Sequence, residues 1–90
     1  MWWWIIPAIL GMIAMLAYES IRDWFSAHKT VTSSHGELVR QKLASGNYRV
    51  VAGVFDRRGT RTAEAAWETS KLDDELKEKF GRSNRVRVEI

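Results

Sequence analysis

The chain has 90 residues, a formal net charge of +3 at pH 7 and no cysteine. This length allows one domain, and the lack of cysteine excludes a disulfide framework, a zinc–thiolate site and a thiol nucleophile. The charge is uneven, because residues 22–62 carry eight basic and three acidic side chains whereas residues 63–90 carry six basic and seven acidic ones.

The N-terminal segment is apolar, and residues 2–18 contain no charged side chain. As a helix it would span roughly 25 Å, close to the roughly 30 Å thickness of bilayer hydrocarbon. An apolar stripe continues to residue 25, and aromatic rings mark both ends, as expected at the two membrane interfaces. These rings are Trp2, Trp3, Trp4, Tyr18 and Trp24. The pattern predicts a transmembrane anchor helix over residues 1–25, in contact with the lipid bilayer.

Three alternatives compete with a single span. A cleaved signal peptide has a basic start, but the first basic residue here is Arg22. A helix lying flat on the membrane needs a polar face, which residues 2–18 lack. Burial inside a soluble core would need a larger domain than the remaining chain supplies. The basic flank at Arg22 and Lys29 predicts a single-pass protein with its C-terminal domain in the cytoplasm.

Beyond the anchor, residues 26–34 are polar and are expected to form a linker, and residues 35–90 are expected to form a small soluble domain. Ser34 and Glu37 have the spacing of a capping box before an apolar face, and Gly46 and Asn47 supply a C-terminal stop. This pattern predicts a short helix over residues 35–44.

Two strands are expected next. Residues 48–55 are rich in β-branched and aromatic side chains. Residues 56–59 form a turn signal in which Gly59 can adopt positive φ. A second strand follows near residues 60–68, with Ala63, Ala65 and Trp67 on one side.

A helix and a strand complete the chain. Thr69 or Ser70 can cap a helix that Gly81 ends, with apolar residues spaced by four on one face. Residues 85–90 alternate strictly between apolar and charged side chains, which is typical of a half-buried strand.

These elements predict an α+β fold in which an α-β-β-α-β domain follows the anchor. The sheet is expected to have three strands and to be mainly antiparallel, with helices on one face and residues 48–55 central if the last strand lies beside them. The strands at residues 60–68 and 85–90 would then be the edges. They are interpreted either as protected edges, one of them partly guarded by Arg85, Arg87 and Glu89, or as sites where a partner strand could add. The predicted core is Leu38, Leu43, Val50, Val54, Trp67, Leu72, Leu76, Phe80, Val86 and Val88.

No pattern in the sequence indicates catalysis, a cofactor or a metal. His28 and His35 lie on the predicted linker or beside it, and a zinc site needs at least three protein ligands at defined spacing. Asp73, Asp74 and Glu75 are successive helical residues, so they splay around the helix instead of converging.

The densest basic cluster is Arg57, Arg58 and Arg61, at the predicted hairpin tip. It is interpreted either as a solvated turn or as a candidate contact with an anionic membrane surface or an acidic partner. Nucleic acid is disfavoured, because exposed aromatic residues that could stack on bases are scarce here.

The leading functional hypothesis is a non-enzymatic, membrane-anchored interaction module. It would be an accessory or regulatory subunit of a larger membrane complex, with a protein partner or a second copy as its ligand. The alternative is a small membrane-active protein, such as a toxin or a stress-induced bilayer modulator, that acts through its transmembrane helix.

Overall fold

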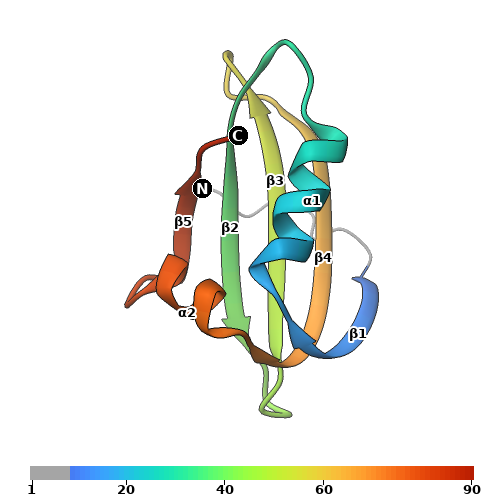
Figure 1. Ribbon diagram of the computed structural model, residues 1–90, viewed down its shortest axis with the longest axis vertical. Helices are drawn as coiled ribbons and strands as arrows, with labels where there is room; N and C mark the ends of the chain where they lie inside the picture. The colour runs from blue at the N-terminus through green and yellow to red at the C-terminus, as the bar shows by residue number, and fades with distance from the viewer. Residues whose placement is uncertain (1–8) are drawn as a thin grey trace.

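The computed structural model of the chain describes residues 9–90, with side-chain burial described from Met12 onward. Seven elements follow one another along the chain (Figure 1). They are β1 (Ile9–Leu16), α1 (Tyr18–His28), β2 (Ser33–Lys42), β3 (Tyr48–Asp56), β4 (Arg61–Leu72), α2 (Asp74–Phe80) and β5 (Arg85–Val88). The strands form one five-stranded sheet in the order β1-β4-β3-β2-β5. The β1–β4 pair is parallel and the other three pairs are antiparallel.

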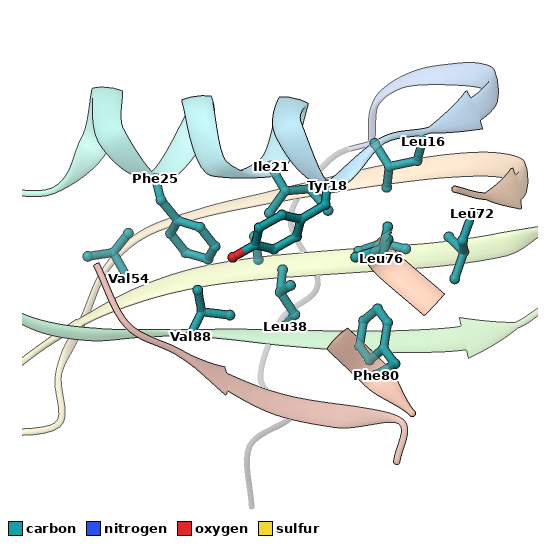
Figure 2. Close-up of a cluster of buried hydrophobic side chains, with 12 residues drawn as sticks. Leu16, Tyr18, Ile21, Phe25, Leu38, Val54, Leu72, Leu76, Phe80 and Val88 are labelled. Carbon is teal, nitrogen blue, oxygen red and sulfur yellow. The ribbon is translucent and has the colours of Figure 1, made fainter. Parts of the chain in front are cut away.

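Both helices lie on the same face of the sheet (Figure 1). From α1, the side chains of Tyr18, Ile21 and Phe25 point into a buried cluster with residues of the strands and α2 (Figure 2). Complete burial of an aliphatic or aromatic side chain stabilises a fold by about 1.5–3 kcal/mol, so this cluster supplies much of the stability. The rest of the cluster is Leu16, Leu38, Val50, Ala52, Val54, Leu72, Leu76, Phe80 and Val88.

Most of the predicted core is confirmed by this cluster. Trp67 and Val86 are partly buried and pack against it, whereas Leu43 lies in the β2–β3 turn region and is only half-buried. The predicted strands at residues 48–55 and 60–68 correspond to β3 and β4, and Gly59 adopts φ +81° in the turn between them. The predicted C-terminal strand corresponds to β5.

The predicted transmembrane helix is wrong. Residues 9–16 form a strand, and the charged side chains after them belong to a separate amphipathic helix, α1, whose Tyr18, Ile21 and Phe25 are buried against the sheet. Within residues 9–90 no helix is long and apolar enough to cross a membrane. The predicted single-pass location, with a cytoplasmic domain, therefore loses its support. The predicted anchor residues Trp2, Trp3 and Trp4 lie outside the described residues.

The other two predicted anchor rings have different roles in the fold. Tyr18 is 7% exposed, and its ring lies 5.0 Å from the Lys79 ammonium of α2. Trp24 is half-buried and meets Trp67 edge-on, with ring centroids 6.1 Å apart. Both rings thus join α1 to other parts of the domain.

The predicted helix over residues 35–44 is also wrong, because this segment is β2. Leu38 points into the cluster beneath the helices, whereas Val39 packs with a second buried cluster. Adjacent apolar residues are therefore buried on opposite faces of a strand, although the same pair also suits one side of a helix.

The extra strands change the predicted topology. Since β2 and β4 occupy the two sides of β3, β5 pairs with the outer side of β2 instead of lying beside β3. The predicted three-stranded sheet is thus contradicted by a five-stranded mixed sheet. The strand at residues 60–68, expected at an edge, is internal where β1 pairs with it from Ala66 onward.

Asp73 connects the C-terminal end of β4 to the C-terminal end of β1, the parallel neighbour of β4. Its backbone N–H donates to the Leu16 carbonyl at 3.0 Å. Its Oδ1 accepts from the backbone N–H of Leu76 at 2.8 Å and of Tyr18 at 3.3 Å. One carboxylate therefore caps α2 and also fixes the start of α1, so neither Thr69 nor Ser70 is the cap.

Replacing Asp73 should loosen this connection. We expect Asp73→Ala to lower the free energy of unfolding by about 1–2 kcal/mol, because a helix cap and a long-range hydrogen bond are both lost. Chemical denaturation measures the change, and Asp74→Ala, at the exposed neighbouring residue, is the control. Equal stability of the two variants would contradict this role.

Gly36 of β2 lies directly beneath Phe25 of α1. A Cβ atom at this position would come within 2.5 Å of the Phe25 ring. We expect Gly36→Ala to displace α1 and to cost about 1–3 kcal/mol of stability through overpacking. Gln41→Ala, at an exposed position of the same strand, is the control for thermal unfolding. A Gly36→Ala variant as stable as the wild type would show that α1 does not pack closely there.

Candidate interaction surface

β1 exposes large apolar side chains on both of its faces, because adjacent residues of a strand point to opposite sides. Met12 is 66% exposed, Met15 49% and Ile13 37%. Among the described residues, the only other exposed large hydrophobic residue is Val31, in the α1–β2 loop. Exposed apolar side chains are thus concentrated on one strand, which is the pattern of a surface that binds another molecule.

The position of β1 makes its backbone part of this surface. β1 is the end strand of the described sheet and pairs with β4 on one side. An edge strand presents backbone N–H and C=O groups to which another strand can add. The pairing with β4 is in register from Met12 to Leu16, and the irregularity lies between Ile9 and Met12. The second half of β1 is therefore the regular part of the edge.

The two edges of the sheet differ in their protection. β1 contains no charged residue and no proline. By contrast, Arg85 and Arg87 are exposed on β5, and the Arg85 Nε donates to Glu37 Oε1 at 2.9 Å. Charged side chains on an edge oppose its pairing with another chain. Of the two, β1 is the edge suited to strand addition.

The face without helices carries a second cluster of buried residues. It consists of Val39, Val51, Phe55 and Ala66. The His35 ring stacks on Phe55 with centroids 5.4 Å apart, and its Nε2 lies 3.3 Å from Glu37 Oε2. His35 is thereby a packing residue whose imidazole contacts a carboxylate.

The remaining residues considered for chemistry are dispersed. His28 stacks on Trp24 and its Nδ1 lies 2.9 Å from the Trp24 carbonyl oxygen. Asp73 acts as a helix cap. Across residues 9–90 no group of three or more His, Asp or Glu side chains is placed to hold a metal ion.

The structure separates the predicted basic cluster into two parts. Arg57 and Arg58 are exposed in the β3–β4 turn, which Asp56 Oδ1 orders by accepting from the N–H groups of Arg58 and Thr60 at 2.9 Å. Arg61 is half-buried on β4, and its Nε lies 3.1 Å from Glu64 Oε2. Only the first two arginines share an open pocket, of about 270 Å³, which Thr32 also lines. Contact of this cluster with an anionic surface stays a prediction.

A further pocket, of about 250 Å³, lies between α1 and the end of the chain. Its lining includes Tyr18, Phe25 and Val88 and the cations of Arg22 and Lys29. Ser26 and Glu89 complete the polar part of this lining.

No family model, curated protein or solved structure matches this chain at a significant level. The function is therefore inferred from the chain's own residues.

The exposed edge of β1 is not among the sites predicted from the sequence. β1 lies within the uncharged apolar segment of residues 2–18, from which a membrane helix is predicted. A short apolar run is consistent with a strand as well as with a helix.

Proposed function

We propose that the chain is a non-enzymatic interaction module, an accessory or regulatory subunit that binds another protein chain through β1. Binding occurs by strand addition: an extended segment pairs with the outer edge of β1, and the apolar side chains of that segment cover Met12, Ile13 and Met15. Main-chain hydrogen bonds supply affinity in this mode, and side-chain contacts supply specificity.

The observation that carries the proposal is that β1, whose outer side pairs with no other described strand, carries no charge and exposes large apolar side chains. Burial of apolar surface contributes about 25 cal/mol per Å², so covering three large side chains adds a favourable term to the backbone pairing. The remainder of the domain holds this edge in place, because Leu16 at the end of β1 is completely buried and hydrogen-bonded to Asp73.

A charge on the edge should abolish binding. We expect Ile13→Lys to remove the stoichiometric partner, whether a different protein or a co-expressed untagged copy of the chain, when the tagged chain is purified from its native cells under mild conditions. The partner would have to desolvate an ammonium group in an apolar contact. Val31→Lys, which places the same charge on an exposed loop, should retain the partner.

Circular dichroism of the purified variants checks that both are folded. If the folded Ile13→Lys chain recovers the same partner as the wild type in the same amount, binding through β1 is excluded.

A further inference from the structure

We infer that the occupant of the β1 edge is β1 of a second copy of this chain, paired antiparallel about a two-fold axis. This inference rests on the proposed function, because it names the partner of the same edge. A two-fold interface brings the same surface patch of two subunits together, so the patch must be complementary to itself.

The composition of β1 satisfies that requirement. Like charges placed directly opposite one another destabilise a strand pair, and β1 has none to oppose. The other edge meets it less well, because self-pairing of β5 about Val86 would place Arg85 of each copy opposite Arg87 of the other. Self-pairing therefore favours β1 over β5, because in a self-paired edge both strands must lack repelling charges.

The regular part of β1 also sets the register. Met12 to Leu16 is the segment without irregularity, and its midpoint is Ala14. With Ala14 on the two-fold axis, Ile13 of each copy lies opposite Met15 of the other. The small exposed Ala14 allows close approach at the centre, and two apolar cross-strand pairs flank it.

The resulting assembly is a continuous sheet. Two five-stranded sheets joined at β1 make one sheet of about ten strands, near the upper size of ordinary twisted open sheets. The axis is perpendicular to the sheet, so the helices of both copies lie on the same face. The charged β5 strands then form both outer edges, which limits the assembly to two copies.

The lack of native cysteine allows a direct test. In the purified full chain, Ala14→Cys should form an intermolecular disulfide under mild oxidation, because opposite Cα atoms of an antiparallel pair are about 4.5–5.5 Å apart, within the roughly 4.4–6.8 Å that a disulfide spans. Val31→Cys, on the exposed loop, is the control for random collision. Non-reducing electrophoresis of dilute samples measures the cross-linked fraction.

A charge pair tests the register. Ile13→Lys alone should weaken the dimer at least about tenfold, since both apolar cross-strand pairs are lost. Adding Met15→Glu in the same chain places opposite charges across both pairs and should recover dimerisation, as measured by sedimentation. Failure of the double variant to recover, with a dimeric wild type, would overturn the Ala14-centred register.

The inference is overturned if Ala14→Cys cross-links no more than Val31→Cys. If the native partner is nevertheless lost in the Ile13→Lys purification, β1 binds a different protein and the proposed function stands. If that partner is retained as well, both proposals fail.

Discussion

The hydrogen bonds of Asp73 hold together two chain segments that are far apart in the sequence. Its carboxylate accepts from Tyr18 and Leu76, and its backbone donates to Leu16. The end of β1 is thus attached to the end of β4, and each helix begins at this junction. Because β1 and β4 both end at this junction, the two strands run parallel. Helix α1 begins there and turns back over the sheet. The cluster beneath the helices and the open edge of β1 both depend on that geometry.

Local patterns predicted β3, β4, the turn between them and β5. Gly59 permits the positive φ of that turn, and the strict alternation of β5 specifies its faces. The apolar spacing placed Leu72, Leu76 and Phe80 on one helical face, which is correct for Leu76 and Phe80, whereas Leu72 is the last residue of β4. In these segments local preference and tertiary burial agree, so the sequence was sufficient.

The errors came from segments whose structure depends on distant partners. β2 buries Leu38 and Val39 on opposite faces, which resembles a helical pair until the sheet is known. Residues 9–16 are apolar throughout, and their strand conformation depends on pairing with β4 more than 50 residues later. The candidate surface could not be predicted because it exists only once β1 is a strand. The arginine cluster was recognised from the sequence. The ion pair between Arg61 and Glu64, both on β4, was not.

The distribution of charge gives the sheet two different edges. β5 carries Arg85 and Arg87, and its pairing with β2 is supported by the Arg85–Glu37 ion pair at 2.9 Å. β1 carries no charge and exposes Met12, Ile13 and Met15. A small domain with a modest core gains stability when such an edge is covered by another chain. Binding at β1 would therefore also stabilise the folded domain.

The most direct test of this account is the conformation of residues 9–16 in solution, measured by nuclear Overhauser contacts in the isotope-labelled full chain. The account predicts cross-strand contacts between Ile13 and Thr69 and between Met15 and Lys71, the pairs in register in the β1–β4 ladder. Contacts between residues three apart along residues 9–16, with none to β4, would show that the segment is a helix. That result would remove the β1 edge and the interaction proposed for it.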